Sequence, residues 1–155
     1  MREFKHADKF WEDLRSGKFA QMVRETSPGR EISNPAEAYH VVKPLFAENK
    51  DVESMYGIFL DAKNCILAIE KVATGTLTCA AVYPREIVKR VISHGAASVI
   101  LLHNHPSGDP TPSEADVKVT RDLIRAGQLL KIEVLDHVIM GKPGHISFRE
   151  LGYFG

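Results

Sequence analysis

Two histidines stand two positions apart at the end of an apolar run, and a carboxylate follows them. The run ASVILL ends at residue 102, His103 and His105 come next, and Asp116 lies beyond a loop. Because alternate residues of a strand point to the same side, both imidazoles can face one centre. Two imidazoles and a carboxylate are a typical donor set for catalytic zinc, which keeps its fourth position open. The spacing therefore predicts a zinc site at His103, His105 and Asp116.

The loop between the histidines and the carboxylate turns the chain back. The segment HNHPSGDPTPSEAD is rich in Gly and Pro, and it brings Ser113 and Asp116 to the start of the next expected helix. Ser113 and Asp116 alone would be an ordinary helix cap. The two histidines alone could be loop residues or ligands of another transition metal. The letters H-N-H also suggest a nuclease, but nucleases of that name spread these residues over a ββα unit. The joint pattern favours a catalytic metal site.

Strands and helices alternate along the rest of the chain. Asn34 and Pro35 provide a cap and a first helical turn, and apolar residues then recur at helical spacing. Strands are expected over 55–60, 65–72, 76–82, 97–102, 131–140 and 145–148, and helices over 35–49, 84–94 and 114–126. This order predicts an α/β fold with a single mixed β-sheet and flanking helices. Residues 1–32 are expected to form a helical N-terminal extension of one domain at 33–155.

The composition excludes several functional classes. The chain has 155 residues, and its 20 Lys and Arg residues balance 20 Asp and Glu residues, so the basic excess of a typical duplex-binding protein is missing. The start lacks an apolar secretory segment, and no apolar run is long enough to span a bilayer, so a cytoplasmic location is expected. Cys65 and Cys79 are too few for a disulfide framework and are expected to be small buried apolar residues.

The residues quoted above also match a known motif. H-x-H-P, a six-residue spacer, Ser, two residues and Asp is the JAMM motif of JAB/MPN metalloproteases, here at His103, His105, Pro106, Ser113 and Asp116. The flanking segments YPREIVKRVISHGAASVILL and IEVLDHVIMG resemble the bacterial RadC-like branch, over about 53–152. The resemblance implies a cytidine-deaminase-like JAB/MPN architecture and a zinc metallopeptidase. The helix-hairpin-helix segment of many RadC-like proteins is not evident in residues 1–50, which weakens a DNA-binding role.

The JAMM pattern also requires an upstream glutamate as general base. Glu53 precedes SMYGIFLD at the family position, whereas Glu70 lies in the second strand of the expected hairpin. We favour Glu53 and keep Glu70 as the alternative. Glu53 would take a proton from the attacking water, and Ser113 would donate a hydrogen bond to the developing oxyanion. The implied reaction is zinc-assisted hydrolysis of a peptide or isopeptide bond.

Other functions and roles stay open at this point. A non-catalytic JAB/MPN interaction module is the main alternative, and a nucleic-acid protein of DNA repair is the third. The implied partner is a peptide or protein substrate, with a ubiquitin-like carrier as one candidate. Residues 1–30 could form a homodimer contact or cover the site. His137 could support the metal site or contact substrate, but we favour a core histidine with satisfied hydrogen bonds.

Overall fold

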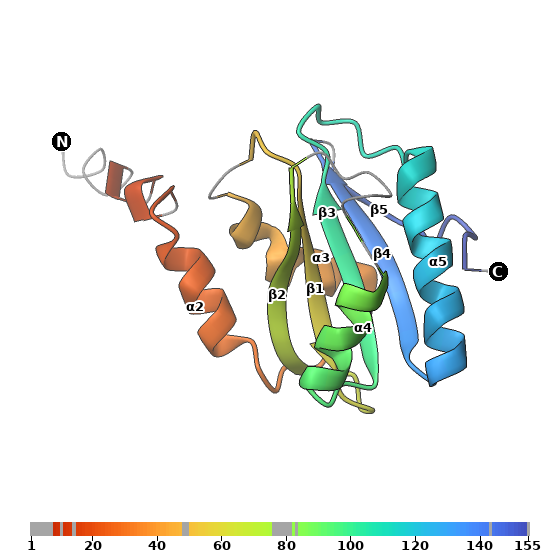
Figure 1. Cartoon of the computed structure of the whole chain (residues 1–155). Coiled ribbons are helices and arrows are strands. Elements are labelled where there is room, and N and C mark those ends of the chain that lie inside the picture. Colours follow the sequence, from red (N-terminus) through yellow and green to blue (C-terminus); the bar gives the residue numbers. More distant parts are fainter. Residues whose placement is uncertain are drawn as a thin grey trace.

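A mixed β-sheet forms the centre of the protein (Figure 1). The computed structural model describes residues 8–9, 11–13, 15–47, 50–75, 82, 84–142 and 144–154. In these ranges the sheet has five strands in the order β2-β1-β3-β4-β5. They are β1 (Ser54–Leu60), β2 (Ile66–Thr74), β3 (Ser98–Asn104), β4 (Glu133–Gly141) and β5 (Gly144–Ser147). β3 and β4 are parallel and the other neighbours are antiparallel, which confirms the predicted mixed sheet.

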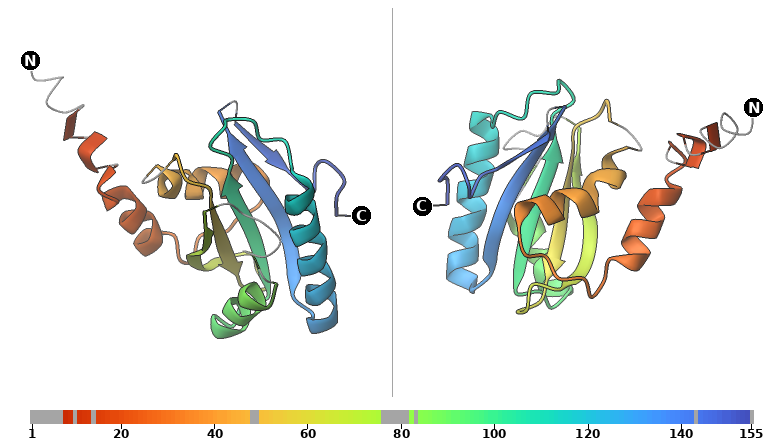
Figure 2. Two further views of the ribbon diagram at one scale, coloured as in Figure 1. Left: turned by 45° about the horizontal axis from the view of Figure 1, so that its top comes forward. Right: turned by 180° about the vertical axis from the view of Figure 1, so that it is seen from behind.

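Helices cover both faces of the sheet (Figure 2). Helix α3 (Pro35–Phe46) packs on one face, and α4 (Pro84–Ser93) and α5 (Glu114–Leu130) pack on the other. Helix α2 (Lys18–Thr26) lies beside α3 and contributes Ala20 to the same apolar cluster. The sheet is thus buried between two helical layers, and successive side chains of β1 and β3 alternate between two separate apolar cores.

The alternation in β3 decides where the first histidine points. Ile100 and Leu102 join the core under α3, whereas Val99 and Leu101 join the core under α4 and α5. Because successive side chains alternate between the faces, His103 falls on the side of α5. It is fully buried there, at the end of the strand.

Helix α5 is longer than the sequence predicts. The helix was expected to end near residue 126, directly before Gly127, but it continues to Leu130. Gly127 instead allows a close approach, because a Cβ atom at this position would lie 2.4 Å from the carbonyl oxygen of Ile132. The helix ends at Lys131, which adopts the left-handed conformation with φ of 58°. The glycine is therefore a packing requirement of the helix and not its terminator.

Three other expectations have mixed outcomes. The strand expected over 76–82 lies outside the described residues, except for Val82, which is in no strand. Cys65 is only half-buried, which contradicts the expectation of full burial, because it belongs to the turn between β1 and β2. Cys79 lies outside the described residues, and the boundary at residue 32 stays a prediction. In the described ranges, no helix is both long and apolar enough to cross a bilayer.

Candidate metal centre

Four side chains from separate elements converge at one end of the sheet. Glu53 comes directly before β1, His103 is the second-last residue of β3, His105 opens the following loop, and Asp116 lies in the first turn of α5. Their ligand atoms all lie within 4.8 Å of one another, and in the described part of the chain this is the only histidine and carboxylate group that could hold a metal ion. The structure thus brings together the three predicted ligands and the predicted base.

The distances between these atoms fit a tetrahedral ion. The Nε2 atoms of His103 and His105 are 3.0 Å apart, and each lies 3.2 Å from an oxygen of Asp116. Ligand atoms about 2.0–2.1 Å from a tetrahedral zinc ion are about 3.3–3.4 Å apart, only slightly farther than observed. Glu53 Oε1 lies farther out, 3.9 Å from both Nε2 atoms. The histidines and Asp116 therefore have the spacing of ligands, with Glu53 beside them.

A chain of buried hydrogen bonds fixes the tautomer of His103. The Thr120 hydroxyl donates to the Asp116 carbonyl oxygen at 2.8 Å, so its oxygen must accept from His137 Nδ1 at 2.5 Å. Burial, followed by the charge of His103, holds the pKa of His137 well below its usual value, so this ring is neutral. Its Nε2 then accepts from His103 Nδ1 at 2.7 Å. In the neutral form of His103 the single ring proton therefore lies on Nδ1, and this tautomer leaves Nε2 for the metal position, as metal-bound histidines require.

The loop after β3 likewise holds the imidazole of His105 so that its Nε2 faces the centre. His105 Nδ1 donates to the carbonyl oxygen of Asp109 at 2.8 Å, which leaves Nε2 for the centre. The hydrogen bond to Asp116 is the main cause that raises the pKa of His105, against the opposing effect of burial. The raised pKa means that the protonated imidazole, with Nε2–H donating to Asp116, is favoured more strongly than in a free histidine. A cation would replace this proton, because ligand histidines bind metals in the neutral form.

Asp116 combines two tasks at the start of α5. Ser113 and Asp116 form a capping box: Ser113 N donates to Asp116 Oδ2 at 2.8 Å, and Asp116 N donates to Ser113 Oγ at 3.1 Å. Burial would raise the pKa of the Asp116 carboxyl group, but hydrogen bonds from His103 and His105 outweigh it and lower this pKa far below its usual value. The helix cap that the sequence suggested is therefore present, and it orients an ionised carboxylate toward both imidazoles.

Asn104 ties the glutamate segment to the histidine strand. Its Oδ1 accepts from Ser54 N at 2.8 Å, and its Nδ2 donates to Val52 O at 3.1 Å, so it holds the backbone on both sides of Glu53. Asn104 itself is only 8% exposed. Gly75 N also donates to Glu53 O at 2.8 Å. These contacts place Glu53 at the centre without using its carboxylate.

Glu70, the alternative base, lies elsewhere. It belongs to β2, and its Oε2 is 3.6 Å from Arg90 Nη1 and 3.2 Å from His94 Nε2, both at the end of α4. The structure thus places Glu53 and not Glu70 beside the histidines. The role of Glu53 as a base stays a prediction.

The loop that carries His105 rests against the end of β4. His105 N donates to Met140 O, and Lys142 N donates to Gly108 O, each at 2.9 Å. A Cβ atom at Gly141 would lie 2.5 Å from Gly108 O and 2.9 Å from Pro110 Cδ, so only glycine allows this approach. Gly108 has a φ of +91°, a left-handed conformation that favours glycine. The two glycines hold the loop, and with it the orientation of His105.

Comparison of the sequence with known proteins identifies the family of this chain. The family model of the RadC-like JAB domain matches residues 32–153. The chain belongs to this family. A UPF0758 protein of Symbiobacterium thermophilum is 46% identical over 122 residues, which cover 79% of this chain and 52% of the relative. A UPF0758 protein of Caldanaerobacter subterraneus is 53% identical over 131 residues, covering 79% of this chain and 56% of the relative.

The same similarity extends to the archaea. A UPF0758 protein of Methanosarcina mazei is 43% identical over 126 residues, which cover 81% of this chain and 55% of the relative. The chain therefore spans about half the length of the curated relatives it matches. As a RadC-like JAB domain with a cluster that could bind a metal ion, it has the features of a JAMM-type metallohydrolase.

Sequence analysis did not identify two residues around the centre, Asn104 and Thr120. In the sequence, Asn104 is noticeable only as the residue between the two histidines, and Thr120 only as part of the expected helix over 114–126. The favoured interpretation of His137 as a buried histidine with satisfied hydrogen bonds is confirmed, and one of its two partners is His103, as the alternative of a support for the metal site requires. Thr120 lies one helical turn after Asp116, on the same side of α5, which is the one sequence signal that could have identified it.

Proposed function

We propose that this chain is a zinc-dependent metallohydrolase of the JAMM type that cleaves a peptide or isopeptide bond. The observation that supports it best is the convergence of two imidazoles, each with its Nδ1 proton engaged elsewhere, on one buried carboxylate. His103, His105 and Asp116 would hold the zinc ion. Zinc in such a site lowers the pKa of a water molecule to about 7 and polarises a substrate carbonyl.

Glu53 would act as the general base. Its side chain is 22% exposed, compared with 3% for Asp116, so it stands on the solvent side of the cluster, where water and substrate enter. A carboxylate at this position can take a proton from the attacking water and pass it to the leaving amine nitrogen. The Asn104 hydrogen bonds keep its backbone in place during both transfers.

Ser113 would stabilise the oxyanion. Its Oγ accepts from Asp116 N at 3.1 Å, so this hydrogen bond uses a lone pair and leaves the hydroxyl proton available to donate. A single donor of this kind accounts for about 10²–10³ in kcat in other hydrolases. The proposed partner is a peptide or protein, with a ubiquitin-like carrier as one candidate.

Two glutamate variants test this proposal. In Glu53→Gln the zinc content should be unchanged, while hydrolysis of peptide and isopeptide substrates should fall by about 10²-fold or more, because the base is removed. This variant can also retain uncleaved substrates for mass spectrometry. Glu70→Gln is the matched control and should keep full activity. Full activity in Glu53→Gln with loss in Glu70→Gln would refute the assignment, and zinc-free, inactive wild-type protein would favour a non-catalytic interaction module.

A further inference from the structure

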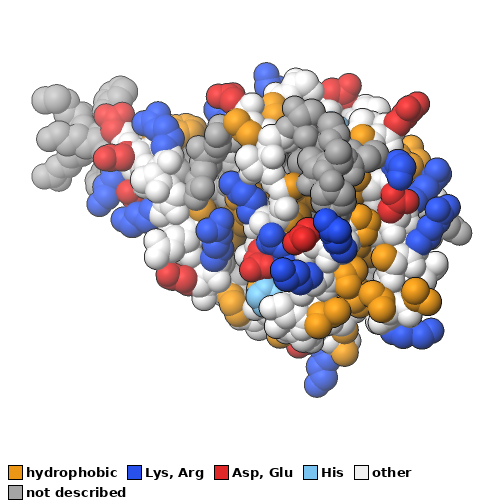
Figure 3. All heavy atoms as spheres, viewed as in Figure 1, with side chains coloured by type: hydrophobic (Ala, Val, Ile, Leu, Met, Phe, Trp, Pro, Cys, Tyr) orange, Lys and Arg blue, Asp and Glu red, His pale blue; other side chains and the backbone are white. Residues whose placement is uncertain are grey.

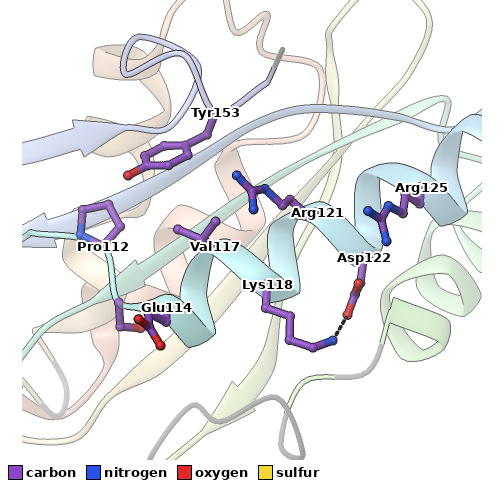
Figure 4. Close-up of a pocket in the computed structure, with 9 residues that line it drawn as sticks. Pro112, Glu114, Val117, Lys118, Arg121, Asp122, Arg125 and Tyr153 are labelled. Atoms are coloured by element: carbon purple, nitrogen blue, oxygen red, sulfur yellow. Dashed lines mark hydrogen bonds and ion pairs between the residues drawn. The ribbon is translucent and has the colours of Figure 1, made fainter.

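A groove runs along the outer side of α5 and begins at the proposed oxyanion donor. It has a volume of about 450 Å³, and Ser113 lies at one end and Arg125 at the other. Figure 4 shows Val117 at its base, with the Tyr153 ring facing Arg121 across the hollow. We call this hollow, between Ser113, Val117, Arg121, Arg125 and Tyr153, the α5 groove. Ser113 N donates to Asp116 Oδ2, so the Ser113 end of the groove is joined to one of the candidate metal ligands.

The charges in the α5 groove are unequal. Lys118 Nζ is 2.6 Å from Asp122 Oδ2, so these two charges neutralise each other. Arg121 and Arg125 are both exposed, and within the described ranges neither guanidinium has an acidic partner. Figure 3 shows Lys and Arg side chains gathered over α5 at the right. Like charges one helical turn apart repel each other, so an anion between them would be stabilising.

Arginine also has the geometry for a particular anion. Its planar guanidinium can donate two parallel hydrogen bonds to a carboxylate. Pro112, Val117 and the Tyr153 ring form an apolar wall along which an extended peptide can lie. A groove with the proposed oxyanion donor at one end and two arginines at the other is therefore suited to a peptide whose carboxylate lies some distance from the cleaved bond.

We propose that the α5 groove binds a carboxylate-bearing segment of the substrate polypeptide, an inference that rests on the proposed hydrolytic function. A helix rises about 1.5 Å per residue, so Arg121 and Arg125 lie about 12 and 18 Å along α5 from Ser113. An extended peptide advances about 3.3 Å per residue, which places the carboxylate roughly four to five residues from the scissile bond. The carboxylate can belong to an acidic side chain or to the C-terminus of the substrate.

The test measures peptide binding, which does not depend on hydrolysis. Labelled peptides about ten residues long, with a pair of glutamates moved stepwise through a neutral sequence, are compared with glutamine counterparts by fluorescence anisotropy. The protein is the full chain with Glu53→Gln and added zinc. The groove variant is Arg121→Gln/Arg125→Gln, and the charge-matched control is Lys63→Gln/Lys89→Gln, which changes two exposed lysines outside the groove. A further arm places only the free C-terminal carboxylate at the matching distance, with the amidated peptide as its control.

We expect the best-placed glutamates to tighten binding by about fivefold, and the groove variant to abolish this preference. The control variant should retain it, and higher salt should weaken it. A preference that amidation removes identifies the C-terminus as the source, and one that amidation leaves unchanged identifies a side chain. An unchanged preference in the groove variant, or equal binding of glutamate and glutamine peptides, overturns the inference.

The outcome also separates this inference from the proposed function. Zinc content and hydrolysis are measured on wild-type protein and on the groove variant in the wild-type background. Hydrolysis without any carboxylate preference would overturn only the inference that the α5 groove binds a carboxylate. A carboxylate preference that depends on Arg121 and Arg125, in a protein without zinc and without hydrolysis, would overturn the proposed function alone.

Discussion

Replacement of Asn104 by leucine should separate the reaction rate from metal affinity. The change keeps the size of the side chain but leaves Ser54 N–H and Val52 C=O without their hydrogen-bond partner in a site where Asn104 is 8% exposed. A buried polar group without a partner costs about 1–3 kcal/mol, so we expect a loss of about 2–4 kcal/mol in the free energy of unfolding. A displacement of Glu53 by about 1 Å would reduce kcat by about 10²-fold. Zinc affinity should change little, because the Asn104 side chain contacts none of the ligand atoms.

A double-mutant cycle with Glu53→Gln provides the assay. If Asn104 acts through Glu53, the leucine variant should slow hydrolysis in the wild-type background but have little further effect when Glu53 is already glutamine. Hydrogen exchange of the Ser54 amide should accelerate in both backgrounds. Asn104→Asp is a second variant, because it keeps an acceptor for Ser54 N–H and replaces only the donor to Val52 O. Additive losses in rate, or a loss of zinc affinity as large as the loss of rate, would refute the positioning role.

Three further predictions concern the surroundings of the metal ligands. Thr120→Val removes the acceptor for His137 Nδ1 and should weaken zinc binding by about tenfold or more in a chelator competition, and unchanged affinity would contradict the tautomer chain. Because the pKa of His105 is raised above 6.5, zinc must displace a proton that is held at a higher pH than usual. Zinc affinity should therefore fall as the pH is lowered through this raised pKa. Zinc titrations at about pH 7 and about pH 5 measure this fall, and equal affinities at the two pH values would contradict the prediction. Gly141→Ala places a Cβ atom 2.5 Å from Gly108 O and should lower the free energy of unfolding by about 1–3 kcal/mol in denaturant titrations, whereas wild-type stability would show that the loop can shift freely.

Local patterns in the sequence predict much of the metal centre. The two-residue spacing of His103 and His105 is a property of one strand and the loop that follows it. The Ser113–Asp116 spacing is a property of one helix start, and both can be interpreted without knowledge of the tertiary structure. The mixed sheet, its five described strands and the helices α3, α4 and α5 are at predicted places for the same reason, since strand and helix periodicities are local, although the end of α5 differs.

Contacts between distant elements could not be predicted in this way. The choice between Glu53 and Glu70 depends on how β1 and β2 lie beside β3, which no local pattern encodes. The contact of His137 with His103 depends on the parallel register of β3 and β4, in which Leu101 is opposite His137. The expected end of α5 near residue 126 was too early: Gly127 has a low helix propensity, but here it lies within the helix and faces the backbone of Ile132.

Zinc stoichiometry in matched variants tests the central claim most directly. The metal content of purified protein, exchanged into zinc and washed free of excess, can be measured by mass spectrometry for wild type, His103→Ala and Glu53→Gln. The account predicts one zinc ion per chain in wild type and in Glu53→Gln, and a large loss in His103→Ala, because His103 is a ligand and Glu53 is not. Equal zinc content in wild type and His103→Ala, or no zinc in any of the three, would contradict the metal centre proposed here.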